Sequence, residues 1–338
     1  MRDGKLKFLY LLLMIFLVAC ETAPVVEMGR LSKRSEDYRV AKFKPPARIV
    51  KKLKPRVVVL PFVDESGVSQ CNLAAIATDT VHNVVASSGS YRLVERAQAK
   101  AIAKELGYQE THGASWEDIE KKYFSLGRNI DYAIVGSITS ARIAANAKNV
   151  VAEVEMNVRV IDLSKGETVQ SFTVKGSESR TMTAGLNPCD VIRSALKDAI
   201  ECPLLVKLRT SIPQYGYVRE VRSYTKDGKL NKVLFVNLGS SDGLRPGDKV
   251  KVIRIERFVD PITKKVSIRY VEIGEGVVAK NGLLPQESMI LVSDPVVVKE
   301  VKIGYLVRPT AFRVESKCQT KKFLQSLGII LNQLGGQQ

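Results

Sequence analysis

Hydrophobic and polar residues alternate most regularly between positions 150 and 160. The apolar positions are Val150, Ala152, Val154, Met156, Val158 and Val160, and the polar positions between them include Glu153, Glu155, Asn157 and Arg159. A period of two residues places one set on a buried face of a strand and the other on a wet face. Further short apolar runs predict strands at Arg56–Val63, Tyr91–Val94, Asp131–Ile143 and Glu167–Lys175.

Apolar residues at helical spacing separate these predicted strands. We predict helices at Asn72–Ser88, at Glu95–Leu106, at about Ser115–Leu126 and at Asp190–Leu205. The order of elements is then β-α-β-α-α-β-β-β-α, which is typical of an α/β sandwich with a central mixed sheet. We place this domain at residues 56–212.

The pattern changes after Pro213 to short strands divided by turn residues. The predicted strands are Tyr217–Tyr224, Lys232–Asn237, Lys249–Arg257, Val266–Ile273, Glu275–Ala279 and Ser288–Val292. Five or six such strands predict a small β-barrel at residues 213–296, so the fold class of the whole chain is α+β. Residues 297–338 are expected to form a C-terminal segment with a short amphipathic helix. The apolar positions of that helix are Phe323, Leu324, Leu327, Ile330 and Leu334.

The first twenty residues have the pattern of an export signal. A short basic start precedes an apolar run, Phe8–Ala19. About 12 apolar residues are too few for a membrane span, which needs roughly 20, but they suit a secretory signal. Leu17–Cys20 resembles the bacterial lipobox, which implies a signal peptide at residues 1–19 and lipid attachment at Cys20. The alternative is an ordinary signal peptide that happens to end in cysteine.

Membrane sorting and the region behind the lipobox follow from the next residues. Glu21, which is not an aspartate, favours the outer membrane over the inner membrane. The net charge of the chain is +17, and Arg30–Arg56 holds eleven Lys and Arg residues against two acidic ones, together with three prolines. We therefore expect residues 20–55 to be a lipidated, mostly extended basic tether. Anionic lipid headgroups or peptidoglycan are its expected neighbours, and nucleic acid is not. A solvated linker without a partner is the alternative.

Four cysteines follow Cys20. They are Cys71, Cys189, Cys202 and Cys318. In an oxidising compartment they allow two disulfides, with three possible pairings. Cys189 and Cys202 flank the stretch Asp190–Glu201, and if this stretch is a continuous helix its ends lie about 18–20 Å apart. Bridged cysteines need Cα atoms within about 7 Å, so these two should not pair with each other.

The residues give no pattern of a catalytic or metal site. The chain has two histidines, of which His82 lies inside a predicted helix and His112 in a Gly/Thr loop. No nucleophile elbow, zinc-protease motif or dinucleotide fingerprint occurs. The glycine-rich run Leu238–Asp248 lacks the Gly-Lys-Ser/Thr ending of a phosphate loop and indicates a structural turn. We expect no enzymatic activity, no cofactor and no metal.

Four segments resemble the CsgG family of bacterial envelope proteins. They are Val58–Ser66, Leu93–Arg96, Asp131–Ile138 and Val158–Glu167, in the family's order and with similar spacing. The resemblance covers about Arg56–Leu208. Outer-membrane lipoproteins such as the curli secretion channel belong to this family. A further segment, Val236–Asp248, resembles the C-terminal SH3-like domain of the flagellar protein FlgT.

The resemblance implies a lipid-anchored outer-membrane protein that faces the periplasm. We expect a homo-oligomeric, non-enzymatic component of a secretion or appendage system, either curli-like or flagellar, which contacts other envelope proteins. The family's channel inserts two long hairpins in the regions that match Ser140–Val151 and Ser177–Asn187. Both regions are short here, so channel activity is not expected. The alternatives are a periplasmic regulator that activates a cell-wall enzyme and a secretion pore.

Overall fold

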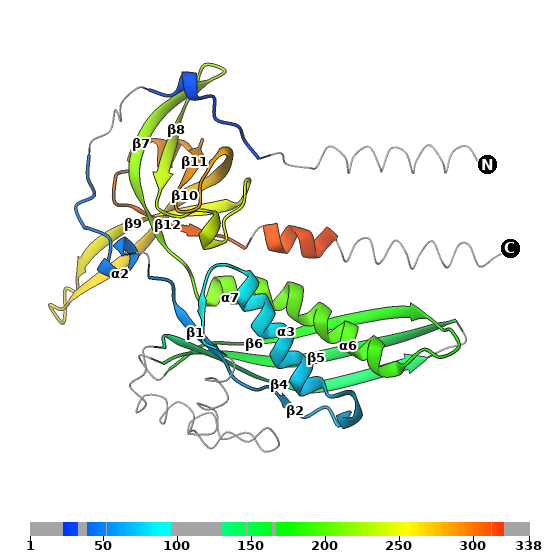
Figure 1. Cartoon of the computed structure of the whole chain (residues 1–338). Helices are drawn as coiled ribbons and strands as arrows, with labels where there is room; N and C mark the ends of the chain where they lie inside the picture. Colours follow the sequence, from blue (N-terminus) through cyan, green and yellow to red (C-terminus); the bar gives the residue numbers. More distant parts are fainter. Residues whose placement is uncertain are drawn as a thin grey trace, which may run out of the picture. The chain divides into compact units, whose positions relative to one another are not determined.

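The chain is described by a computed structural model that covers residues 23–32, 39–51, 53–95, 130–145, 148–163, 167–311 and 313–320. It divides into two units, which are taken separately below. The barrel unit contains the described residues up to Val50, Tyr215–Ser240 and Leu244–Pro309. The sheet unit contains Lys51–Gln214, Ser241–Gly243 and the described residues from Thr310 onward. Both units combine strands with helices, so the predicted α+β class is confirmed (Figure 1).

A mixed sheet forms the framework of the sheet unit. Its strands are β1 (Arg56–Val59), β2 (Val63–Asp64), β3 (Arg92–Leu93), β4 (Tyr132–Ala145), β5 (Asn149–Asp162) and β6 (Glu167–Thr181). Their order is β3-β1-β4-β5-β6, with β2 beside β4. Strand β1 is parallel to β3 and β4, whereas β4, β5 and β6 are antiparallel. The predicted central mixed sheet is therefore present.

Strand β5 has the two faces that its sequence predicts. Every second residue from Val150 to Val160 is buried, whereas Glu153 and Asn157 are exposed. The buried face packs with residues of the helices into one hydrophobic core. These helices are η2 (Ser69–Cys71), α3 (Leu73–Ser87), α6 (Pro188–Ala199), η3 (Ile200–Leu204) and α7 (Leu205–Ser211). Figure 1 shows α3 and α6 beside the sheet.

The last helical run is longer than predicted. Its N-terminus is set by Asn187, whose side-chain oxygen accepts a hydrogen bond from the Cys189 amide at 2.9 Å. The run then continues through the π-helical turn η3, which contains Pro203, to Ser211. Proline lacks the N–H that an α-helix uses, and a wider turn absorbs that loss without ending the helix. The predicted end at Leu205 was therefore too early.

The connections around β5 and β6 are short. Three residues join Ala145 to Asn149, and six join Thr181 to Pro188. Strand β6 extends past the predicted Lys175 because it keeps pairing with β5 as far as Thr181. Helix α6 lies against β6 at Gly176, where an added Cβ would be 2.1 Å from the Ala195 carbonyl oxygen.

The barrel unit is a closed six-stranded barrel with the order β10-β11-β8-β7-β12-β9. Its strands are β7 (Gly216–Lys226), β8 (Lys229–Val236), β9 (Lys249–Val259), β10 (Val266–Leu283), β11 (Ser288–Val292) and β12 (Leu306–Pro309). The short helices are η1 (Met28–Arg30), α2 (Ala47–Val50) and α8 (Pro295–Glu300). A further short helix, η4 (Ser240–Asp242), ends in the Ser241–Gly243 segment that belongs to the sheet unit.

The barrel differs from the prediction in two places. The runs predicted as separate strands at Val266–Ile273 and Glu275–Ala279 form one strand, β10, with a shift of register between Glu272 and Gly274. Strand β12 comes from the segment assigned to the C-terminal part at 297–338, and it closes the barrel between β9 and β7. The barrel therefore extends beyond residue 296 to Pro309. Residues 313–320 form a helix, and the five apolar positions of the predicted amphipathic helix, Phe323 to Leu334, lie outside the described residues.

Residues 20–55, which were predicted to be an extended tether, differ most from their prediction. The described residues of this region up to Val50 belong to the barrel unit, and Val26 and Leu31 are buried there. The charge of the region dominates its composition, but a few apolar residues are enough to fix a chain to a neighbouring surface. The predicted helix at 115–126, and all but the first residue of that at 95–106, lie outside the described residues.

Candidate functional site

The predicted lipid-attachment residue, Cys20, lies outside the described residues, which begin at Ala23. Residues 23–32, called the docked arm below, follow it and lie on the barrel. The Lys280 amide donates a hydrogen bond to the Pro24 carbonyl oxygen at 2.8 Å. The Asn281 side chain accepts from the Val26 amide at 3.0 Å and donates to the Val26 carbonyl oxygen at 2.6 Å. The arm is thus fixed to β10 four residues after Cys20.

Apolar contacts hold the rest of the docked arm. Val26 and Leu31 are buried in one cluster with Tyr224, Val233 and Met289 of the barrel. Leu31 forms an antiparallel bridge with Tyr224, and the Ser32 amide donates to the Ser223 carbonyl oxygen at 3.1 Å. The arm therefore runs across the barrel from β10 to β7.

A second piece of the predicted tether, residues 39–50, is also bound to the barrel. Val40 forms a parallel bridge with Ile303, and the Asn237 side chain donates to the Ile49 carbonyl oxygen at 3.3 Å. Asn237 also accepts a hydrogen bond from the Tyr217 amide at 2.6 Å. The glycine-rich run that follows Asn237 is a turn, because Gly243 and Gly247 both have φ of +82°. That geometry agrees with the structural interpretation of the run.

The four cysteines after Cys20 form two disulfides. Cys71 pairs with Cys189, with Cα atoms 5.2 Å apart, and Cys202 pairs with Cys318, with Cα atoms 5.5 Å apart. The prediction that Cys189 and Cys202 do not pair is confirmed. The first bridge joins η2 to the start of α6, and the second joins η3 to the helix at 313–320. Neither bridge uses the thiol of Cys20.

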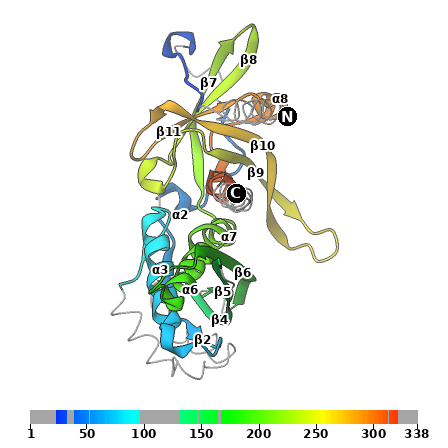
Figure 2. The ribbon, with the colours of Figure 1, turned by 90° about the vertical axis from the view of Figure 1, so that its right-hand side faces the viewer.

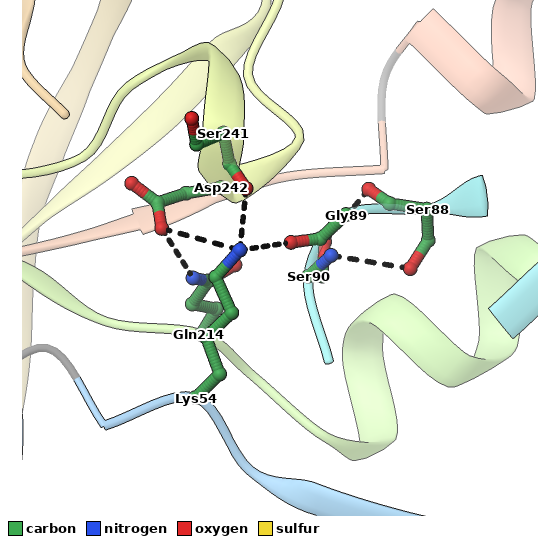
Figure 3. Close-up of polar contacts among 7 residues, drawn as sticks. All are labelled: Lys54, Ser88, Gly89, Ser90, Gln214, Ser241 and Asp242. Carbon is green, nitrogen blue, oxygen red and sulfur yellow. Dashed lines mark hydrogen bonds and ion pairs between the residues drawn. The ribbon is translucent and has the colours of Figure 1, made fainter. Parts of the chain in front are cut away.

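A polar cluster in the sheet unit centres on Lys54 (Figure 3). The Lys54 Nζ donates to the Gly89 carbonyl oxygen at 2.7 Å and to that of Ser241, and it lies 3.7 Å from the Asp242 Oδ1. The Gln214 Nε2 donates to the same Asp242 oxygen at 3.5 Å. The Lys54 side chain is 29% exposed and that of Asp242 9% exposed. The cluster is an ammonium group held by two carbonyls and a carboxylate. It joins Lys54 to segments 35 and 187 residues away in the sequence, and we interpret it as a structural contact.

The hairpin of β9 and β10 exposes most of its apolar side chains. Ile262 in its turn is 89% exposed, and Val259, Val266, Ile268 and Tyr270 are each at least half exposed. Val259 pairs with Val266 and Arg257 pairs with Ile268. Paired residues and every second residue share a face, so Val259, Val266, Ile268 and Tyr270 lie on one face of the hairpin. Figures 1 and 2 both show the hairpin extending away from the barrel. Exposed apolar surface of this kind marks an interaction site in many soluble proteins.

The turn of this hairpin is held by an aspartate. The Asp260 carboxylate accepts hydrogen bonds from the amides of Ile262 at 2.8 Å and Thr263 at 2.7 Å. The bond from Thr263 and then that from Ile262 lower the pKa of Asp260 below its ordinary value. The turn lies between the strands predicted at Lys249–Arg257 and Val266–Ile273. The signal of the exposed hairpin in the sequence is the run of apolar and basic residues on both sides of Asp260-Pro261.

The described residues include one of the two histidines. His82 lies in α3, as predicted, and His112 is outside the described part of the chain. Within that part, no group of three or more His, Cys, Asp or Glu residues could hold a metal ion. No described helix combines the length and the apolar character needed to cross a membrane.

Comparisons with known proteins find structural similarity at low scores. The sequence matches no protein-family model and no curated protein. Among solved structures, lipoprotein GNA1162 from Neisseria meningitidis is similar, with 18% identity, a TM-score of 0.30, and coverage of 42% of this chain and 94% of that chain. The C-terminal domain of LpoB from Escherichia coli is similar with 19% identity, a TM-score of 0.27, and coverage of 39% and 93%. The PelC dodecamer from Paraburkholderia phytofirmans is similar with 15% identity, a TM-score of 0.25, and coverage of 47% and 92%.

Similarities of this size establish neither a shared fold nor a shared function. Because no family model matches, the resemblances to the CsgG family and to FlgT stay hypotheses that rest on the sequence.

Proposed function

We propose that the chain is a non-enzymatic, lipid-anchored protein of the bacterial outer membrane, acylated at Cys20 and facing the periplasm. In this proposal the CsgG-like sheet unit and the SH3-like barrel unit act as a structural or assembly component of a secretion or appendage system. The protein works as a homo-oligomer or with other envelope proteins, and it needs no cofactor.

The arrangement of the cysteines carries the proposal. All four cysteines after Cys20 are taken up by two disulfides, and such bridges persist in oxidising compartments such as the periplasm. The fifth cysteine, Cys20, lies at the end of the lipobox-like run Leu17–Cys20. The two disulfides support export to an oxidising compartment. In an exported chain, the Cys20 thiol lies where a lipobox protein carries its lipid.

The exposed hairpin supports an assembly role. An assembly component needs a surface that binds another protein, and the apolar face around Ile268 supplies one on the barrel unit. The connections from β4 to β5 and from β6 to α6 are short. The family's channel carries long hairpins in these two regions, so the short connections argue against the channel alternative.

In-cell crosslinking tests this function. A photo-crosslinking residue in place of Ile268 is compared with the same residue in place of Ser177, an exposed position on β6 of the sheet unit. We expect the residue at position 268 to capture a second copy or a secretion or appendage protein, identified by mass spectrometry, and the residue at 177 to capture much less. Capture of a cell-wall synthase alone would replace the assembly role by the regulator alternative. Steady single-channel currents from the purified protein in planar bilayers would overturn the non-channel assignment.

A further inference from the structure

The docked arm begins close to the predicted lipid. Between Cys20 and Pro24 the chain advances four residues, which span at most about 14 Å even when fully extended. The Lys280 amide donates to the Pro24 carbonyl oxygen, and Val26 forms two hydrogen bonds with the Asn281 side chain, one as donor and one as acceptor. The 35-residue spacer that the composition predicted is therefore not available to separate the barrel from the anchor.

The surface around the arm has the chemistry of a membrane contact. Val25, Met28 and Leu230 are each more than half exposed. The β7–β8 hairpin, whose Tyr224 packs on the arm, turns back between Lys226 and Lys229. Lys280 lies on the strand that binds the arm, whereas Arg30 pairs with Glu27 at 2.7 Å and Asp227 lies in the hairpin turn. The four basic and two acidic residues of this region leave a net positive charge of two (4 − 2). Basic residues beside an anionic lipid surface contribute about 1 kcal/mol each, and apolar side chains between them suit shallow insertion.

We propose that residues 23–32 hold the barrel directly against the anionic membrane surface that carries the lipid of Cys20. This inference rests on the proposed acylation. The partner is a phospholipid surface, and the contacting region is the one around Lys280 and the docked arm. The β9–β10 hairpin is then directed to the periplasm, because Lys265 is 15 residues from Lys280 along the chain, up to about 50 Å of strand. In Figure 1 the hairpin tip lies at the lower left of the barrel and the start of the arm on its right-hand side.

Position-specific fluorescence tests the proposal on the mature, acylated protein in vesicles. A fluorescent amino acid replaces Lys280 in one sample and Lys265 in the other. Both lysines are exposed, and they lie in β10 and directly before it, so the two probes are matched. The vesicles contain phosphatidylethanolamine, phosphatidylglycerol and a lipid with a quencher on its headgroup. We expect the probe at 280 to be quenched several-fold more strongly than the probe at 265. Equal quenching at the two positions in fully bound protein would overturn the proposal.

Two further samples separate the arm from the anchor. Release of the arm by the double substitution Val26→Ser and Asn281→Ala should remove most of the difference between the probes while the protein stays bound through its lipid. A difference that persists unchanged would contradict the role of the arm.

In a second preparation the Cys20 thiol is coupled in vitro to a maleimide phospholipid. If the cell-made protein carries no lipid but the coupled protein shows the expected quenching, the proposed anchor fails and the geometry of the arm stands. If both probes are quenched equally in the coupled protein, the proposed placement of the arm at the membrane is wrong, whether or not the cell attaches a lipid to Cys20.

Discussion

At the scale of single residues, the buried hydroxyl group of Tyr91 joins parts of the sequence that are far apart. The Tyr91 hydroxyl lies 3.2 Å from the Leu208 carbonyl oxygen and 3.3 Å from that of Ile212, at the end of the last helical run. Burial raises the pKa of Tyr91 above its ordinary value of 10.0, against the lowering effect of Arg209. The phenol therefore stays protonated in the folded protein over the whole neutral range.

Substitution of Tyr91 by Phe should change stability in a pH-dependent way. At about pH 8 the loss of the hydroxyl contacts should cost about 1 kcal/mol of the free energy of unfolding. The folded pKa is raised, so the stabilising effect of this group is present below pH 10.0 and is lost as the pH rises above it. Tyr91→Phe should therefore lose less stability between about pH 9 and 11 than the parent protein. Urea unfolding at several pH values measures this, and parallel curves for the two proteins would contradict it.

Lys54 is the second residue whose contacts can be tested. Lys54→Met leaves the carbonyls of Gly89 and Ser241 without their donor and the Asp242 carboxylate without its nearest ammonium group. We expect a loss of about 1–3 kcal/mol, measured by urea unfolding. Lys207→Met, at an exposed lysine of α7, is the matched control and should change stability by less than about 0.5 kcal/mol. In a double-mutant cycle, Asp242→Asn should lower the free energy of unfolding less in the Lys54→Met protein than in the parent protein. Additive effects of the two substitutions would show that the ion pair contributes nothing.

At the scale of elements, the contact of α6 with β6 depends on one glycine. The Cβ of Gly176→Ala would lie 2.1 Å from the Ala195 carbonyl oxygen and 2.4 Å from the Ala199 amide nitrogen, so the helix would have to move. Overpacking of this kind costs about 1–3 kcal/mol. Ser177→Ala, the next residue and exposed, should be nearly neutral. Denaturant unfolding measures both, and an unchanged midpoint for Gly176→Ala would contradict the close packing.

The two disulfides should contribute unequally to the stability of the sheet unit. Cys71 and Cys189 cross-link positions 118 residues apart within the core, so their joint replacement by Ala should cost about 2–4 kcal/mol. Joint replacement of Cys202 and Cys318 should mainly free the helix at 313–320, which limited proteolysis would detect. Peptide mapping without reductant gives the pairing itself. A peptide that joins Cys189 to Cys202 would contradict the assigned bridges.

Elements could be predicted where the burial pattern is local. Strand β5 followed from its sequence because one buried face repeats every two residues, and α3 followed from its apolar spacing. Strand β12 has only four residues and ends at Pro309, so it carries no period, and only its pairing with β9 and β7 makes it a strand. The docked arm was missed for a similar reason. Its two buried residues, Val26 and Leu31, form no periodic pattern, and they meet barrel residues about 200 or more positions away.

The candidate sites were less predictable than the fold. Lipid attachment at Cys20 is predicted from neighbouring residues, because a lipobox is a local motif, and this prediction lies outside the described residues. The Lys54 cluster depends on contacts with residues 35 and 187 positions away, for which the sequence has no signal. The exposed face of the β9–β10 hairpin is visible in the sequence only as apolar residues beside a turn, and their exposure follows from the length of the two paired strands.

At the scale of the whole molecule, the account depends on compartment. Under the proposed function, export explains why four cysteines are bridged, and lipid attachment gives the fifth cysteine a function. The proposal also places the hairpin in a space in which partners of a secretion or appendage system are found. Each of these statements fails if the chain is not processed at its N-terminus.

The mass of the N-terminal peptide tests that claim most directly. The protein is extracted from the membrane fraction of a bacterium that expresses the full chain, digested, and analysed by mass spectrometry. We expect the peptide to begin at Cys20 and to carry a diacylglyceryl group, and we expect the Cys20→Ser variant to leave the membrane fraction. A chain found in the cytosol with Met1 and unmodified Cys20 would contradict the account.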